Sequence, residues 1–493
     1  MISSHLPILL VVVPLIAAPV MVILRSGTAA WILAIAVSWT ALAIAGVLFA
    51  QVAGGGTISY FLGSWPAPWG IEYRVDRVNA YLALLVGVIA AAVSIYSPRS
   101  ILSEVEPGRR YLFYTMYALC LSGLLGIAVT GDAFNLFVFL EISSLSSYVL
   151  IALGRDRRAL VAAYQYLVMG TIGATFYVIG VGMLYLATGT LNLSDMAERL
   201  PRVTEPRAVL AALAFITVGV SLKLALFPLH LWLPNAYAYA PSAVTAFLAA
   251  TATKVSVYVL LRYYYSVFGG GAVFLALPMA EILLVFSLAA MFIASTVAIF
   301  QDDVKRMFAY SSVAQIGYIT LGVALASATG LTAGLVHVFN HALTKGALFL
   351  LLGGIALRAG AMRLGSLGGI GRVMPLTCFG IVVGGLSLIG IPATVGFVSK
   401  WYLVQAALER GSLSIAFAVV ASSLLALVYV WRFVEVAYFR EPDAKVAALR
   451  EAPVSMLVPA WALVAACVYF GIDTDLTLGG AAAAAEQLLL GAK

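Results

Sequence analysis

Charged residues are scarce in this sequence. Only 10% of its 493 residues are Asp, Glu, Lys or Arg, whereas a soluble domain has about 25%. Hydrophobic residues make up 63% of the chain, and the mean hydropathy is +1.05. No long polar segment interrupts the apolar pattern. The sequence therefore predicts an all-α polytopic membrane protein that forms one membrane domain over residues 1–493.

Motifs that hold cofactors, metals or nucleic acids are also missing. Cys120, Cys378 and Cys467 lie far apart in apolar runs, without metal or redox spacing. There is no phosphate-binding loop, no dinucleotide fingerprint after a strand and no haem or cluster ligand set. The net charge of +7 comes from basic residues in short loops rather than from a basic stripe with aromatics. We expect no cofactor, no bound metal and no nucleic-acid partner.

Apolar runs long enough to cross about 30 Å of hydrocarbon recur along the whole chain. About fourteen are expected, two of them broken by proline. The first 24 residues contain no Lys or Arg, so we expect this run to be retained as a helix rather than removed as a signal peptide. The expected spans are 6–24, 30–52, 78–97, 111–130, 134–153, 161–187, 208–238 (broken), 242–265, 273–300, 307–327, 331–357, 374–408 (broken), 413–438 and 455–471.

Basic residues in the loops predict the orientation. With the N-terminus outside, the inner loops hold about twice as many Lys and Arg residues as the outer loops, as the positive-inside rule requires. The run GRDRR at 154–158 is the strongest inner signal. Both termini are then expected outside. Lys305, in the short charged loop QDDVKR, is expected to be solvated and to help set this orientation.

Lysine has an unusual distribution. Four of the seven lysines, namely Lys223, Lys254, Lys345 and Lys400, fall inside apolar spans, while arginine dominates the loops. A charged side chain at the bilayer centre costs about 2.5–3.5 kcal/mol on insertion scales, so such residues usually have a function. Lysine can release a proton in a protein and arginine cannot. The distribution indicates proton transfer; snorkelling is the alternative for a lysine near a span end.

Glu141 is an isolated carboxylate about eight residues into its span. It is expected to pair with a lysine from another helix, since no basic residue lies beside it. At about 4 Å and an effective dielectric of about 20, such a pair is worth about 4 kcal/mol. The serines that follow, from Ser143 to Ser147, favour close helix contacts and a polar interior. The alternative is a glutamate at the interface that holds a loop.

His337, His341 and Lys345 are spaced by four residues, which places them on one helical face. A zinc site is not expected, because no third ligand is near. The face either carries protons or is a packed pair of core histidines. Ser311 and Gln315 could hold water nearby, and His230 could feed the same group or simply pack.

The two broken spans share a pattern in which G-x-S-L is soon followed by proline, at Pro228 and Pro392. Transporters with internal repeats place ion sites at such discontinuous helices. We expect N-terminal helices at about 1–100, a first repeat at 110–265, a second at 273–440, and a last helix and tail at 455–493. Lys400, after the second break, is expected to be an exit or transfer site; the alternative is a lysine reaching the interface beside Trp401 and Tyr402.

Several stretches resemble the proton-translocating antiporter-like subunits shared by respiratory complex I and the multisubunit Mrp cation/proton antiporters. The matching stretches, in the family's order, are NLFVFLEISSLSSYVLIALG, SLKLALFPLHLWLPNAYAYAPS, DVKRMFAYSSVAQIGY, HVFNHALTKGALFL and GIPATVGFVSKWYL. The sequences of residues 134–153 and 188–196 are most similar to those of the D-type subunits of the Mrp antiporters. The resemblance implies fourteen helices with two inverted five-helix repeats. It also implies an ion pair between Glu141 and Lys223, and a hydrophilic axis continued by Lys254, His337, His341 and Lys400.

The function that the resemblance implies is that of a proton-translocating subunit rather than an enzyme. Its partners would be other membrane subunits of a hetero-oligomeric complex in a prokaryotic cell (inner) membrane. In an Mrp-type complex, proton flux would drive export of Na⁺ or a similar monovalent cation. The alternative is a pumping subunit of a complex I-type or membrane-bound hydrogenase-type enzyme. An assembly subunit with a vestigial channel and a stand-alone symporter also remain open.

Overall fold

Almost the whole chain is helical. A computed structural model describes residues 2–204, 206–275 and 277–490, and thirteen helical stretches within them are long and apolar enough to cross a membrane. The shorter apolar helix α18 together with α19 supplies one more crossing. The prediction of an all-α polytopic membrane protein with about fourteen spans is confirmed. The helices of the first part are α1 Leu6–Leu24, α2 Gly27–Val52, α3 Arg77–Glu104, α4 Arg110–Val129, α5 Ala133–Ala152, α6 Arg157–Thr188, α7 Leu193–Arg199, α8 Pro206–Leu224, α9 Trp232–Tyr239, α10 Ser242–Ala250 and α11 Ala252–Leu261.

The second part of the chain continues the same bundle. Its helices are α12 Gly270–Leu275, α13 Met279–Ala289, α14 Ser295–Ile299, α15 Val304–Ala324, α16 Ala328–Ala359, α17 Ile370–Val373, α18 Pro375–Ile389, α19 Val395–Glu409, α20 Leu413–Val434, α21 Ala444–Ala447, α22 Val454–Ile472 and α23 Gly480–Leu490. Short π-helical turns join α13 to α14 and extend α11 and α20.

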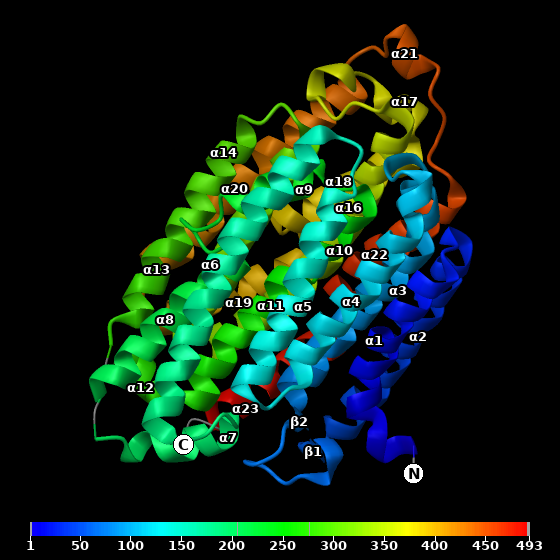
Figure 1. Cartoon of the computed structure of the whole chain (residues 1–493). Helices are drawn as coiled ribbons and strands as arrows, with labels where there is room; N and C mark the ends of the chain where they lie inside the picture. Colours follow the sequence, from blue (N-terminus) through cyan, green and yellow to red (C-terminus); the bar gives the residue numbers. More distant parts are fainter. Residues whose placement is uncertain (1, 205, 276, 491–493) are drawn as a thin grey trace.

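The bundle has two distinct ends (Figure 1). One, which we call the hairpin end, carries both chain termini, α7, α23 and a small antiparallel hairpin of β1 Ile58–Phe61 and β2 Glu72–Val75. The opposite, arginine-rich end carries α17, α21 and the connection between α5 and α6. Both termini lie at one end because the number of crossings is even. The hairpin had no counterpart among the predicted elements.

Both proline-containing spans are interrupted, in agreement with the prediction. In the first, α8 ends at Leu224 and α9 begins at Trp232, and Pro228 lies between them. In the second, α18 ends at Ile389 and α19 begins at Val395. Gly390, just after α18, has a φ of 90°, a left-handed conformation that favours glycine. Proline breaks a helix because it has no N–H to donate. A third break, at Thr251 between α10 and α11, was not predicted.

Helix α16 lies at the centre of the bundle. Its side chains are buried from Gly330 to Ile355, and it packs against α10, α15, α18, α19 and α22. A helix that is apolar and buried all round belongs to the interior of a large bundle. The polar residues of α16 are therefore held in the driest part of the protein.

Gly353 of α16 lets three helices meet. A Cβ there would overlap the hydroxyl oxygen of Tyr96 on α3 and lie 2.6 Å from the Cβ of Ser242 on α10. We expect Gly353→Ala to lower the free energy of unfolding by about 1–3 kcal/mol, the usual cost of overpacking. Thermal unfolding of the purified protein in detergent measures this.

Gly182 of α6 is the matched control, since a Cβ there would meet nothing within 4 Å. Gly182→Ala is expected to leave the midpoint unchanged or to raise it, because alanine favours the helix. Equal midpoints for the two variants would contradict the close packing described at Gly353.

Candidate functional site

Glu141 and Lys223 form an ion pair across two helices. The Lys223 ammonium on α8 donates to Glu141 Oε1 at 3.3 Å and to Ser144 Oγ at 2.7 Å, both on α5. Lys223 sits in the last turn of α8, next to the break. The structure thus brings these two residues together in the way that the sequence resemblance implied, with a serine of the predicted polar run as the second acceptor.

Glu141 is also reachable from the side of the bundle. Its side chain is 24% exposed, whereas that of Lys223 is 5% exposed. Val138 and Leu145, one turn to either side on α5, are exposed apolar residues. A carboxylate at this depth on a lipid-facing surface is costly. The arrangement therefore fits a helix that faces another subunit at this point.

A group of buried aromatic side chains lies next to the ion pair. This aromatic cluster consists of Tyr148, Tyr166, Trp232 and Tyr237. Tyr166 stacks on Trp232 with centroids 3.8 Å apart and meets Tyr148 edge-on at 4.7 Å. Tyr237 donates to the carbonyl of Leu248 at 3.3 Å and faces Thr253, the neighbour of Lys254. The cluster thus has one member, Tyr148, near Ser144 of the ion pair and another, Tyr237, near the neighbour of Lys254, and sequence reasoning missed it.

Lys254 is held at the unpredicted break between α10 and α11. Its ammonium donates to the carbonyl of Ala249 at 2.5 Å and to Thr253 Oγ1 at 3.2 Å. It is 1% exposed and makes no ion pair among the described residues. The break provides the acceptor, because a continuous helix would use the Ala249 carbonyl for its own hydrogen bond.

His337, His341 and Lys345 line one face of α16, as their spacing predicted. His337 bonds Ser399 Oγ at 2.7 Å through Nδ1 and Gln315 Oε1 at 2.9 Å through Nε2. The His341 ring is nearly parallel to that of His337, at a centroid distance of 6.0 Å. Within the described part of the chain, neither ring nitrogen of His341 has a hydrogen-bond partner. A buried, unsatisfied imidazole is expected where water or a proton is exchanged.

Lys345 and the two accessory residues on α15 belong to the same group. The Lys345 ammonium donates to the carbonyl of Phe308 at 2.7 Å and to Ser311 Oγ at 2.5 Å, and Gln315 bonds His337. His230 is not among them. Its ring packs on Phe227 at 5.2 Å and against Tyr310 at 6.4 Å, which fits the packing alternative for this residue.

Lys400 turns back toward the second helix break. Its ammonium donates to the carbonyls of Leu388 and Ile389 at 2.8 and 3.0 Å and to Ser423 Oγ at 2.9 Å. The side chain is 6% exposed, so it does not reach an interface beside Trp401, which was the alternative interpretation. Ser399, the residue before it, contacts His337 and links Lys400 to the histidines.

A polar cluster at the arginine-rich end differs from the sequence expectation. Lys305 is buried rather than solvated, and it donates to Ser242 Oγ at 2.9 Å and faces Glu104 Oε1 at 3.9 Å. Glu104 also accepts from the backbone N–H and the hydroxyl of Ser242 at the start of α10. Sequence reasoning missed this cluster because Glu104 and Lys305 are about 200 residues apart.

A cavity of about 440 Å³ opens beside this cluster, and Glu104 and Lys305 line it. The hydrogen bond and charge of Arg158 lower the pKa of Asp156 at its rim. Burial raises the pKa of Asp303, against the opposing effect of backbone hydrogen bonds. Deeper in, the buried Tyr96 hydroxyl has no hydrogen-bond partner in the described structure and lies next to Ser242 across Gly353.

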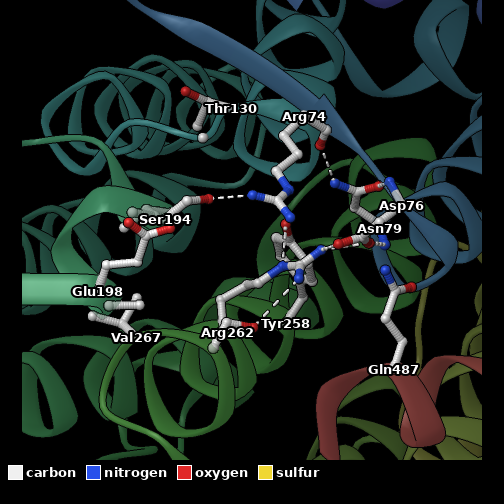
Figure 2. Close-up of a pocket in the computed structure, with 14 residues that line it drawn as sticks. Arg74, Asp76, Asn79, Thr130, Ser194, Glu198, Tyr258, Arg262, Val267 and Gln487 are labelled. Carbon is white, nitrogen blue, oxygen red and sulfur yellow. Dashed lines mark hydrogen bonds and ion pairs between the residues drawn. The ribbon is translucent and has the colours of Figure 1, made fainter. Parts of the chain in front are cut away.

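Two of the cavities at the hairpin end are lined by residues that lie near buried lysines in sequence. One of about 280 Å³ contains a buried ion pair in which Arg262 Nη2 donates to both carboxylate oxygens of Asp76 at 2.5 Å (Figure 2). Tyr258 accepts from the same guanidinium at 3.0 Å, and Lys254, Tyr258 and Arg262 follow at four-residue spacing along α11 and the π-helical turn that extends it. The other cavity, about 500 Å³, is lined by Thr332 and Tyr402, which lie near His337 and Lys400 in sequence.

Comparison with known proteins agrees with this geometry. Residues 130–426 match the family model described as NADH:quinone oxidoreductase/Mrp antiporter, TM. The N subunit of the NADH-quinone oxidoreductase of Desulforudis audaxviator is 43% identical over 96% of this chain and 97% of its own length. The D subunit of the Na⁺/H⁺ antiporter of Bacillus subtilis is 29% identical over 99% of this chain and 97% of its own length.

Solved structures give the same result. A chain of the Mrp complex from Dietzia sp. superimposes with a TM-score of 0.90 at 26% identity, covering 99% of this chain and 98% of that chain. A chain of the membrane-bound sulfane sulfur reductase, an archaeal respiratory membrane complex, gives 0.89 at 28% identity and covers 99% and 100%. The match spans the ion pair, the lysines and the histidines described above. The chain is therefore a member of the NADH:quinone oxidoreductase/Mrp antiporter transmembrane family.

Proposed function

We propose that this chain is the proton-translocating subunit of a multisubunit cation/proton antiporter, in which proton flux drives export of Na⁺ or a similar cation. The observation that carries the proposal is the buried polar series from Glu141 and Lys223 through Lys254 and the α16 histidines to Lys400. One cavity, lined by Glu104 and Lys305, lies at the arginine-rich end of the bundle, and another, lined by Thr332 and Tyr402, lies at the hairpin end. Buried ionisable groups in membrane helices typically mark such proton relays.

The ion pair supplies the switch. While Glu141 stays within 3.3 Å of Lys223, the carboxylate stabilises the charged ammonium. A basic group on a neighbouring subunit would draw Glu141 outward across its exposed face, and Lys223 would lose a contact worth about 4 kcal/mol at an effective dielectric of about 20. The proton then moves by way of the aromatic cluster to Lys254. This step makes partner subunits part of the mechanism.

Reconstitution tests the function directly. Vesicles containing the complete complex are expected to dissipate an imposed pH gradient when Na⁺ is added, as measured by a fluorescent pH-gradient dye. A complex that holds its gradient under these conditions would contradict antiport.

A redox-driven pump is the second candidate. It is favoured by the 43% identity to a protein named as the N subunit of an NADH-quinone oxidoreductase. The subunits that co-purify with the chain distinguish the two candidates. Iron–sulphur and flavin subunits identify a redox pump, whereas small hydrophobic subunits alone identify an antiporter.

The arginine-rich end is proposed to face the cell interior, following the positive-inside rule, with proton uptake through the cavity beside Glu104. We expect a Ser103→Cys variant, altered in the wall of this cavity, to lose most of its transport after reaction with a bulky, membrane-impermeant thiol reagent. The reagent should act only in vesicles that expose the inner face. The three native cysteines are buried, so background labelling is low. Proton flux before and after labelling is the measurement.

Ser412, just before α20 at the other end, is the control. Ser412→Cys should react only from the outer face, and labelling should leave proton flux unchanged. Block of the Ser103→Cys variant from the outer face would reverse the proposed orientation, and labelling without block would remove this cavity from the path.

A further inference from the structure

Lys400 differs from the other buried lysines in what holds it. Three uncharged oxygens surround its ammonium: the carbonyls of Leu388 and Ile389 and the hydroxyl of Ser423, at 2.8, 3.0 and 2.9 Å. We call this group the Lys400 oxygen site. Lys223, by contrast, is paired with a carboxylate, and Lys254 and Lys345 each contact only one backbone carbonyl.

The helix break accounts for both free carbonyls. In a continuous helix, Leu388 would accept from the N–H of residue 392, but Pro392 has none. Ile389 would accept from Ala393, whose backbone has turned away to φ 67°. The left-handed cap at Gly390 directs the backbone N–H groups of Gly390 and Ile391 to carbonyls one turn earlier, those of Leu386 and Ser387. The carbonyl oxygens of Leu388 and Ile389 are therefore free of helix hydrogen bonds, and both accept from the Lys400 ammonium.

The electrostatics of the spot favour a cation with a single charge. It lies at the C-terminus of α18, where the helix dipole is negative, and the ring of Tyr318 on α15 faces the ammonium at 4.5 Å. No carboxylate of the described residues lies within ion-pairing distance of Lys400. A divalent ion prefers carboxylate oxygens, whereas a monovalent ion is satisfied by neutral oxygens at an unwound helix.

The other groups that face Lys400 are few. Besides Tyr318, His337 of α16 lies beside the site, where it is bonded to Ser399, the neighbour of Lys400. From α20 the hydroxyl of Ser423 contacts the Lys400 ammonium, and it also lies 3.3 Å from the Tyr318 hydroxyl. The cavity of about 500 Å³ at the hairpin end is lined by Thr332 of α16 and Tyr402 of α19, the two helices that carry His337 and Lys400.

From this geometry we infer that the Lys400 oxygen site binds the transported monovalent cation, and that the Lys400 ammonium is a tethered competitor for the same oxygens. A Na⁺ ion can occupy the site only after the lysine has given up its proton, because the charged ammonium otherwise holds the same oxygens. Cation and protonated lysine therefore exclude one another, which couples release of a proton to binding of a cation. The inference rests on the proposed antiport function and assigns the cation a place in this chain.

Removal of the competitor tests the inference. We expect the complex carrying Lys400→Met to bind ²²Na⁺ at equilibrium at least about tenfold more tightly than the unmodified complex, because apparent affinity scales with the fraction of free sites. Ser423→Ala added to Lys400→Met should reverse the gain. Lys445→Met, which removes the ammonium of an exposed lysine on α21, should leave ²²Na⁺ binding unchanged. Choline chloride replaces NaCl in the blank.

A second measurement uses the unmodified lysine, in case Lys400→Met does not assemble. Addition of NaCl to the wild-type complex in weakly buffered detergent should release about one proton per cation bound, by linkage, and Ser423→Ala should abolish that release. Unchanged ²²Na⁺ affinity in an assembled Lys400→Met complex, or unchanged proton release in Ser423→Ala, would overturn the inference. Binding needs no transport, so these results are independent of whether the complex moves protons.

Discussion

Replacement of Glu141 by glutamine is expected to lower proton transport by about 100-fold or more, the scale on which loss of an acid–base group acts. The variant keeps the shape of the side chain but removes the charge that holds Lys223 at 3.3 Å. The lysine then has only Ser144 as a partner, so nothing can switch its affinity for a proton. Proton flux in reconstituted vesicles measures the effect, with subunit composition checked by size-exclusion chromatography.

Glu281 provides a matched carboxylate. It lies at the start of α13, is 63% exposed and pairs with Arg410 at only 3.9 Å. Exposed pairs of this kind contribute little to stability, so Glu281→Gln should transport protons at the normal rate. Normal flux in an assembled Glu141→Gln complex would remove this carboxylate from the mechanism and with it the switch.

Lys254→Arg is expected to be as inactive as a neutral variant, although it keeps the positive charge. An arginine does not release its proton in a protein, so a relay that passes through residue 254 stops there. A loss of about 100-fold or more is expected, as for other acid–base groups. The same vesicle assay measures it, and the flux of Lys254→Arg should match that of Lys254→Ala.

Lys305→Arg is the control that separates charge from proton exchange. Lys305 faces Glu104 and Ser242 beside a cavity of about 440 Å³, where a fixed positive charge is enough to hold the cluster. This variant should keep most of its transport. Substantial proton flux through Lys254→Arg would show that residue 254 supplies only a charge.

The positions of the helices could be predicted from the apolar runs along the chain, because the bilayer sets both the length and the polarity of a span. The breaks at Pro228 and Pro392 were predictable for an equally local reason, the missing N–H. The sequence also indicated which residues were unusual, since Glu141 and the buried lysines stand out against apolar neighbours. The spacing of His337, His341 and Lys345 placed them correctly on one face of α16.

The partners of these residues were harder to predict, because they come from distant parts of the chain. Lys305 was predicted to be a solvated loop residue. Only the fold shows that Glu104 approaches it from α3. The break at Thr251 could not be predicted, because no proline or glycine lies in the sequence of α10 or α11. Lys400 was placed in the right span, but its acceptors are backbone carbonyls, which leave no mark in the sequence. The aromatic cluster was missed because buried tyrosines are common in any large apolar core.

The exposed edge of Glu141 has a consequence for how the protein is made. A newly inserted copy presents this carboxylate to lipid until a neighbouring subunit covers it, and uncovered charge at that depth is expensive. We therefore expect the lone polypeptide to be removed by quality-control proteases more readily than the assembled one. Balanced synthesis of the chain and its partners would then be required by the position of one side chain on α5.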